Sequence, residues 1–319
     1  GIQIEKCLDN EWVDAICIED CQDDTPQTNP PTEIFTNPPT KSPIKFDCTT
    51  DPNRPADIKQ VLETVSNQLD LGRPSSYQFQ AYSWIVNNDG RRLCADDESL
   101  LQRYILTLIY SMGGDQWDRA ETFGNYKIAT PECSWYGVTC INDTVVNLIF
   151  SGINMSGSIP VEIGKLKRLQ KLNFENNLIT GKIPDTIGML STLTNLDLDR
   201  NLMTGTLPNS IYYLPNLIWL DIDNNQISGT ISNKIGELSA IEVLSLWNCN
   251  FSGTIPEEIS KLQYLQDLSL DGNNLSGSVP QSLCDLRSGN GSLEFIATDC
   301  NGSPPKVVCT CCDKCYPEV

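Results

Sequence analysis

Apolar residues recur with a fixed period through the second half of the chain. Six glycines are each separated by 24 residues: Gly157, Gly181, Gly205, Gly229, Gly253 and Gly277. Nine and seven residues before each glycine lies a pair of apolar residues, Leu148/Phe150, Leu172/Phe174, Leu196/Leu198, Leu220/Ile222, Leu244/Leu246 and Leu268/Leu270. Because alternate side chains of a strand share one face, each pair predicts a short strand with both side chains turned inward.

Polar and turn-forming residues complete the repeat. Four residues before the glycine stands Asn177, Asn201, Asn225 or Asn273, with Ile153 in the first copy and Cys249 in the fifth. Such an asparagine can bond backbone groups that would otherwise be buried without partners. A proline three residues after the glycine, replaced by Ser232 in the fourth copy, helps to turn the chain away from the strand. No copy can bury its apolar face alone, so the pattern predicts stacked coils and a parallel sheet of six strands, about 28 Å across.

The repeat reads L-x-x-L-x-L-x-x-N-x-L-x-G-x-I-P-x-x-I-G-x-L, as in residues 169–190. Over residues 141–286 it resembles the plant-type leucine-rich repeat of receptor ectodomains and polygalacturonase-inhibiting proteins. The resemblance implies an α/β leucine-rich-repeat solenoid with a parallel sheet on its concave face. The preceding run from Cys133 to Cys140, CSWYGVTC, resembles the N-terminal cap of that family, which implies a disulfide between these two cysteines. Residues 113–117 and the cysteine-rich tail resemble secreted repeat proteins of algae such as diatoms.

The segments on either side of the repeats predict two caps. Helical patterning over residues 57–69, 77–86 and 97–112 predicts a helical cap on the first repeat. Residues 25–56 are rich in proline and threonine and are interpreted as an extended linker or a bound strap. At the other end, Leu293 and Phe295 are expected to lie in a final strand. The predicted parts are therefore residues 1–50, 51–140, 141–286 and 287–319.

Cysteines and glycosylation signals indicate an extracellular protein. The chain has 14 cysteines, most of them near its ends, and six N-glycosylation acceptors at Asn142, Asn154, Asn250, Asn274, Asn290 and Asn301. We expect glycans away from the central sheet. Cys7, Cys17, Cys21 and Cys48 predict a small disulfide-held module, and Cys309 to Cys315 a disulfide-rich cap, although their spacing also suits a metal. Cys249 is expected to be a buried free thiol. Gly1 is not followed by a leader-like sequence, so we expect that a signal peptide has been removed.

The charge and the missing histidine narrow the function. A net charge of −19 disfavours nucleic acid and anionic lipid as partners. Without histidine, the histidine-dependent catalytic constellations and metal sites are excluded. Paired carboxylates could still catalyse glycoside hydrolysis, but here they are expected to be too exposed for perturbed pKa values. The sequence therefore predicts a protein that is not an enzyme.

Acidic side chains occupy two outward columns of the predicted sheet. Stacking brings Asp197, Asp199, Asp221 and Asp223 together, with Glu175 beside them and Arg200 as a nearby counter-charge. Trp219, Trp247 and Asp271 follow on the same face. Carboxylates suit Ca²⁺ or a basic segment, and tryptophans suit a protein or a glycan, so these eight acidic and aromatic residues are the predicted ligand-binding surface. The alternative is an acidic face that only solvates the protein.

Three roles fit this pattern. The favoured one is an adhesion or structural protein of a cell surface, wall or other extracellular assembly, whose partner is another extracellular protein or a glycan. The alternatives are the ectodomain of a ligand-sensing receptor and a soluble inhibitor of a wall-degrading enzyme. No cofactor is expected, apart from Ca²⁺ at the acidic columns.

Overall fold

The computed structural model describes residues 7–8, 11–12, 47–112, 129–287 and 292–317. It divides into two units, residues 1–46 and 47–319. In the first unit, β1 (Cys7–Leu8) pairs antiparallel with β2 (Glu11–Trp12). Cys17, Cys21, residues 25–46, residues 113–117 and Asn290 lie outside the described residues.

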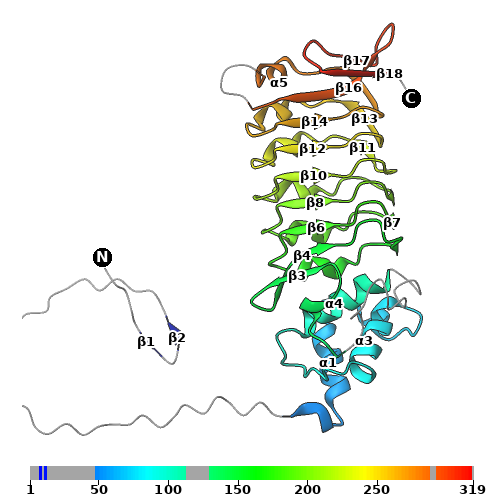
Figure 1. Cartoon of the computed structure of the whole chain (residues 1–319), viewed down its shortest axis with the longest axis vertical. Helices are drawn as coiled ribbons and strands as arrows, with labels where there is room; N and C mark the ends of the chain where they lie inside the picture. Colours follow the sequence, from blue (N-terminus) through cyan, green and yellow to red (C-terminus); the bar gives the residue numbers. More distant parts are fainter. Residues whose placement is uncertain (1–6, 9–10, 13–46, 113–128, 288–291, 318–319) are drawn as a thin grey trace, which may run out of the picture. The chain divides into compact units, whose positions relative to one another are not determined.

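The second unit is built on a sheet that runs through all the coils (Figure 1). Among the described residues it has nine strands, in the order β18-β16-β14-β12-β10-β8-β6-β4-β3, and we call it the long sheet. Its strands are β3 (Val138–Ile141), β4 (Thr144–Ile149), β6 (Lys171–Asn173), β8 (Asn195–Asp197), β10 (Trp219–Asp221), β12 (Val243–Ser245), β14 (Asp267–Ser269), β16 (Phe295–Asn301) and β18 (Lys314–Pro317). Only β3 is antiparallel to its neighbour β4. The repeats therefore supply six of these strands, and the two caps extend the same sheet.

Equivalent residues of successive coils are register partners. Leu172 pairs with Leu148 on one side and with Leu196 on the other. The inward leucines of the six repeats are fully buried, namely Leu148, Leu172, Leu196, Leu220, Leu244 and Leu268. Burying a leucine contributes roughly 1.5–3 kcal/mol relative to an exposed one. The hydrophobic period in the sequence thus becomes a continuous column of apolar contacts.

The asparagine column joins neighbouring coils from inside. The Asn225 amide nitrogen donates to the carbonyls of Leu198, Ile222 and Asp223, each at 3.0 Å. Its carbonyl oxygen accepts from the backbone N–H of Met203 at 2.9 Å. Asn177, Asn201 and Asn273 make the same pattern. Buried backbone groups next to the sheet are satisfied in this way.

The return path of each coil follows from its glycine and proline. The repeat glycines have φ values between 76° and 99°, which favour a residue without a side chain. Prolines precede the 3-10 helices η4 (Val161–Lys165), η5 (Asp185–Met189), η6 (Asn209–Tyr213) and η8 (Glu257–Lys261). Before η7 (Asn233–Glu237), the Ser232 side chain accepts from the N–H of Lys234 instead. Short strands on this side are β5 (Ser156–Gly157), β7 (Leu178–Gly181), β9 (Leu202–Met203), β11 (Ser228–Thr230), β13 (Asn250–Thr254), β15 (Asn274–Ser278) and β17 (Val307–Val308).

A helical cap covers the first coil, but one of its predicted helices is wrong. The cap contains η1 (Cys48–Thr50), α1 (Arg54–Leu62), α2 (Gln68–Leu71), α3 (Tyr77–Asn87), α4 (Leu100–Ser111) and η3 (Glu132–Ser134). The single helix expected over residues 57–69 is broken between α1 and α2. There Ser66 turns inward, donates to Glu162 at 2.6 Å and bonds the Tyr104 hydroxyl at 2.8 Å. A contact across 96 residues therefore ends a helix that the local pattern would continue.

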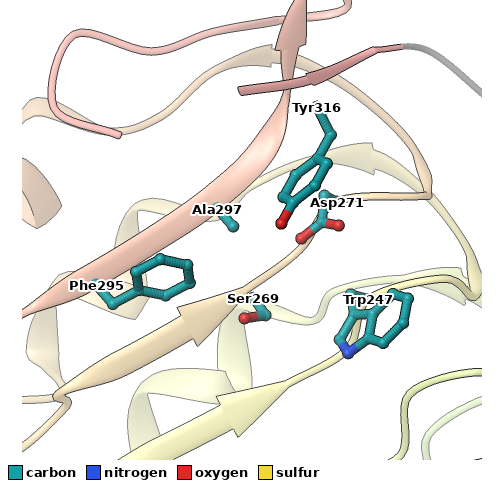
Figure 2. Close-up of a pocket in the computed structure, with 6 residues that line it drawn as sticks. All are labelled: Trp247, Ser269, Asp271, Phe295, Ala297 and Tyr316. Atoms are coloured by element: carbon teal, nitrogen blue, oxygen red, sulfur yellow. The ribbon is translucent and has the colours of Figure 1, made fainter. Parts of the chain in front are cut away.

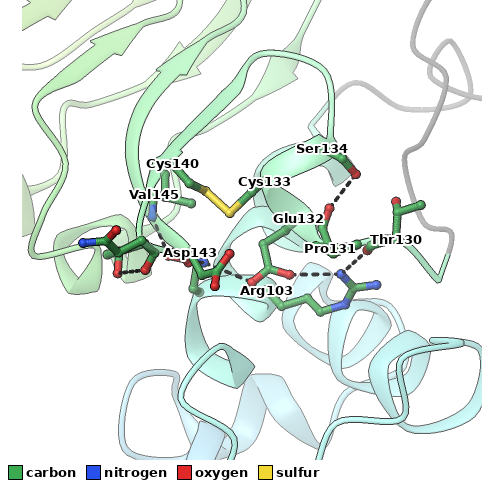
Figure 3. Close-up of a disulfide and its surroundings, with 12 residues drawn as sticks. Arg103, Thr130, Pro131, Glu132, Cys133, Ser134, Cys140, Asp143 and Val145 are labelled. Carbon is green, nitrogen blue, oxygen red and sulfur yellow. Dashed lines mark hydrogen bonds and ion pairs between the residues drawn. A yellow bond between two sulfur atoms is a disulfide. The ribbon is translucent and has the colours of Figure 1, made fainter.

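A buried arginine holds the cap together (Figure 3). Arg103 is fully buried, bonds Asp89 at 2.5 and 2.7 Å and reaches Glu132 at 3.2 Å. Its guanidinium lies over the rings of Trp84 and Trp135, with its central carbon 5.3 and 4.8 Å from their centroids. Beside Glu132, Cys133 and Cys140 form a disulfide, the pairing that the family resemblance implies.

The remaining described disulfides correct one expectation and support another. Cys48 bonds Cys94 in the helical cap, so its assignment to an N-terminal module is wrong. At the C-terminal end, Cys284 of α5 (Gln281–Asp285) bonds Cys311 of the cap, and within the cap the bonds are Cys300–Cys315 and Cys309–Cys312. These thiols are therefore not metal ligands. The strand expected over Leu293 and Phe295 is β16, but it begins at Phe295 and leaves Leu293 outside, and β18 lies beyond it as a further strand. Cys249 is a buried free thiol, as predicted.

Candidate functional site

The register of the long sheet brings the predicted acidic residues together. Asp197 on β8 is the register partner of Asp221 on β10. Asp199 and Asp223 lie two residues beyond the ends of these strands, and Glu175 lies two residues beyond β6 on the preceding coil. One carboxylate oxygen from each of Glu175, Asp197 and Asp199 lies within 4.8 Å of the others. We call Glu175 and the four aspartates the acidic patch.

Part of the acidic patch is buried, contrary to expectation. Asp199 and Asp223 are 5% and 4% exposed. The chain bends sharply after each of them, because the next residues, Arg200 and Asn224, have positive φ values of 49°. The N–H of Asp223 also donates to the Asp221 carboxylate at 3.2 Å. These two carboxylates are therefore largely shielded from solvent.

Burial changes the acidity of these groups. Desolvation, followed by the charges of Asp197 and Asp223, raises the pKa of Asp199 to about 7. Desolvation, followed by the charge of Asp223, also raises the pKa of Asp221 well above its ordinary value. The pKa of Asp197 is raised mainly by burial as well. The expectation that these carboxylates are too exposed for perturbed pKa values is therefore wrong.

The hydrogen bonds of the patch leave one oxygen without a partner. Asp223 accepts from the Asn224 side chain at 2.6 Å and from the Ser245 hydroxyl at 3.1 Å. Arg200 lies 3.0 Å from Glu175 and 3.1 Å from Oδ2 of Asp199, as the expected counter-charge. The other oxygen of Asp199, Oδ1, is buried and has no hydrogen-bond partner. An unpaired buried acceptor costs folding free energy, on the order of 1–3 kcal/mol.

The two predicted tryptophans lie in separate hollows of the long sheet. Trp219 is 38% exposed and lines a hollow of about 320 Å³ with Asp197 and Lys171. Trp247 is half-buried and lines a second hollow with Asp271, and Figure 2 shows its six lining residues. Phe295 and Tyr316 of this hollow come from the C-terminal cap and were missed in the sequence. They lie outside the 24-residue period, so no repeat column pointed to them.

The described glycosylation acceptors are accessible. Asn142, Asn154, Asn250, Asn274 and Asn301 are exposed. Asn250 and Asn274 begin β13 and β15 on the return side of the coils. Asn301 instead ends β16 of the long sheet. Glycan attachment at these positions stays a prediction.

The chain is similar to plant receptor structures. Residues 148–285 match the model of a leucine-rich repeat region. The chain is similar to the Arabidopsis receptor kinase HAESA in complex with the peptide hormone IDA and the co-receptor SERK1, with 29% identity over 60% of this chain and 32% of that one, and a TM-score of 0.51. The SOBIR1 ectodomain from Arabidopsis thaliana gives 28% identity over 56% and 95%, with a TM-score of 0.47. The PEPR1–AtPEP1 complex gives 34% over 49% and 22%, with a TM-score of 0.47.

This chain spans 22% of the length of PEPR1 and 32% of that of HAESA. No helix among its described residues is long and apolar enough to cross a membrane. The coils, the asparagine column, the cysteine caps and the similarity to HAESA agree with one another. Residues 148–285 are a leucine-rich repeat region of the type found in plant receptor ectodomains, and they form the centre of the solenoid.

Proposed function

We propose that this protein is secreted and binds a basic segment of another extracellular protein on its acidic patch. The observation that carries the proposal is the buried Asp199 carboxylate, which keeps one unpaired oxygen among three other aspartates. Like charges on adjacent strands oppose folding, so the patch has no stabilising role of its own. A lysine or arginine from a partner would bind at the half-buried Asp197 and Asp221 beside it and relieve the repulsion.

The biological role of the protein is supported by its structural similarity and its composition. HAESA, whose structure is similar, was solved with a peptide hormone, which favours a peptide or protein as the ligand here. We favour an adhesion or structural protein of a cell surface or wall assembly, with a receptor ectodomain and an inhibitor of a wall-degrading enzyme as alternatives. The sequence contains no histidine, which favours binding over catalysis.

A second candidate is a Ca²⁺ site at Glu175, Asp197 and Asp199. Their oxygens lie within 4.8 Å of one another, and Ca²⁺ prefers carboxylate ligands. The unpaired oxygen of Asp199 fits such an ion. However, Arg200 already pairs with Glu175 and Asp199, so an ion would compete with this guanidinium. A basic segment meets the same competition, and it is the first choice because HAESA, whose structure is similar, was solved with a peptide hormone.

The test compares two double variants with the same change in charge. Asp199→Asn/Asp223→Asn removes two charges from the patch, whereas Asp96→Asn/Asp185→Asn removes two exposed charges elsewhere. Calorimetry with a lysine- and arginine-rich decapeptide should give an affinity lowered about tenfold or more by the first variant only. Equal weakening by both variants would reveal only a general effect of net charge and would contradict the proposal.

The same calorimetry with Ca²⁺ alone separates the two candidates. Saturable Ca²⁺ binding that is lost in Asp199→Asn, without decapeptide binding, would favour the ion site. Trp219→Ala/Trp247→Ala should weaken a protein or glycan partner and barely affect an ion. If none of these variants changes any binding, the acidic patch is a solvated surface.

A further inference from the structure

The hollow around Trp247 is a built pocket near the C-terminal end of the long sheet. It holds about 360 Å³ and is lined by side chains from the last two coils and the C-terminal cap, namely Trp247, Ser269, Asp271, Phe295, Ala297 and Tyr316. Figure 2 shows Asp271 beside Tyr316 and Trp247, with Phe295 across the hollow. The small side chains of Ser269 and Ala297 lie between them and leave the space open.

Disulfide bonding fixes one wall of this pocket. β18 pairs with β16, with Ala297 opposite Lys314 and Thr298 opposite Cys315. Cys315 is bonded to Cys300 at the end of β16, which holds the neighbouring Tyr316 at the pocket. The pocket is therefore shaped before any ligand arrives, which lowers the entropy lost on binding.

Asp271 is a buried carboxylate without a partner side chain. It is 8% exposed, and no side chain among the described residues bonds or pairs with it. Lys314 is close enough for its charge to act on Asp271, but its ammonium lies over the Phe295 ring, 5.9 Å from the ring centroid. Desolvation first, and then the charge of Asp299, raises the pKa of Asp271. A carboxylate in this position favours a ligand that brings a positive charge.

The aromatic and acidic side chains that line the pocket favour one kind of positively charged group. A guanidinium is planar, donates two parallel hydrogen bonds to a carboxylate and stacks on aromatic rings. A lysine ammonium is more strongly hydrated and cannot make the bidentate contact. We infer that the pocket receives an arginine side chain of the protein partner whose basic segment lies on the acidic patch. This inference rests on the proposed function, because Asp223 and Asp271 lie on the same face of the sheet.

The pocket can be tested without the partner. Nα-acetyl-arginine amide is the probe, and Nα-acetyl-citrulline amide, which has the same shape without the charge, is its matched control. Binding is followed by saturation-transfer NMR and tryptophan fluorescence. The arginine probe should bind about tenfold or more tightly than citrulline, and Asp271→Asn should abolish that preference. Asp185→Asn, which lies outside both the pocket and the acidic patch, should leave it unchanged.

One further variant and one measurement guard against a misfolded protein. Ala297→Leu should fill the pocket and weaken both probes, and near-ultraviolet circular dichroism reports whether each variant keeps its fold. Equal binding of both probes, or no effect of Asp271→Asn, overturns the inference. So does a β-glucan oligosaccharide that binds in place of arginine with the same dependence on Asp271, since the pocket would then be a glycan site. If the decapeptide binds and the arginine probe does not, only the inference about the pocket is overturned. If the arginine probe binds and the decapeptide does not, only the proposed function is overturned.

Discussion

Asp199 combines burial, unpaired hydrogen-bonding capacity and nearby negative charge in one side chain. Folding raises its pKa from 3.8 to about 7, so the folded protein holds a proton that the unfolded chain releases. The stability linked to this proton is therefore complete below pH 3.8 and is lost as pH rises through about 7. We expect the melting temperature to fall between about pH 5 and pH 8, and Asp199→Asn to raise it by about 2 °C at the upper end. Differential scanning calorimetry measures this, and Asp185→Asn should leave the pH profile as it is.

The same carboxylate should make partner binding depend on pH in the opposite sense. A basic segment pairs with the ionised form, whose fraction increases as pH passes about 7. Decapeptide affinity should therefore increase several-fold between about pH 6 and pH 8, with proton release during titration. In Asp199→Asn this increase should shrink. An affinity that is independent of pH would show that Asp199 does not contact the ligand.

At the scale of a repeated element, the fifth coil lacks the asparagine that the column provides elsewhere. Cys249 gives one weak contact, from its thiol to the Ile222 carbonyl at 3.4 Å, where Asn225 makes four hydrogen bonds. We expect Cys249→Asn to stabilise the protein by about 1 kcal/mol and Asn225→Cys to destabilise it by about 2 kcal/mol. Urea unfolding of the two variants measures both effects. A loss of stability in both would mean that the fifth coil is packed around sulfur.

Two arginines of the helical cap, Arg103 and Arg91, should differ strongly in how much they stabilise the protein. Arg103→Met would leave Asp89 buried without its ion-pair partner and Glu132 with Arg91 alone, at a cost of about 3–5 kcal/mol. Arg91→Met removes a partly exposed cation from Glu132, which keeps Arg103, so its cost should stay below about 1 kcal/mol. Thermal unfolding would distinguish them, and equal costs would show that Arg103 acts through its apolar contacts.

The sequence predicts the elements that depend on a local pattern, and it misses those that depend on contacts between residues far apart in the chain. The strands, the asparagine column and the inward Cys249 follow from a local period, and the solenoid follows from their repetition. The break at Ser66, the Cys48–Cys94 bond and the placing of Tyr316 beside Trp247 each depend on residues far along the chain. The acidic residues were predicted, but their burial was not, because it depends on how adjacent coils cover the turn after each strand.

At the scale of the whole sheet, its in-register strands set a fixed spacing between equivalent side chains. Equivalent side chains recur about every 4.8 Å, so Asp223 and Asp271, two coils apart, are separated by about 9.6 Å. A polyproline II segment repeats its side-chain direction every third residue, over about 9.3 Å, whereas a β-strand repeats every second residue, over about 6.8 Å. Only the polyproline II repeat of about 9.3 Å matches the distance of about 9.6 Å between equivalent side chains two coils apart. Peptides with arginines three residues apart and prolines between them should therefore bind more tightly than isomers with arginines two residues apart. Calorimetry on such a pair of peptides measures this difference in affinity.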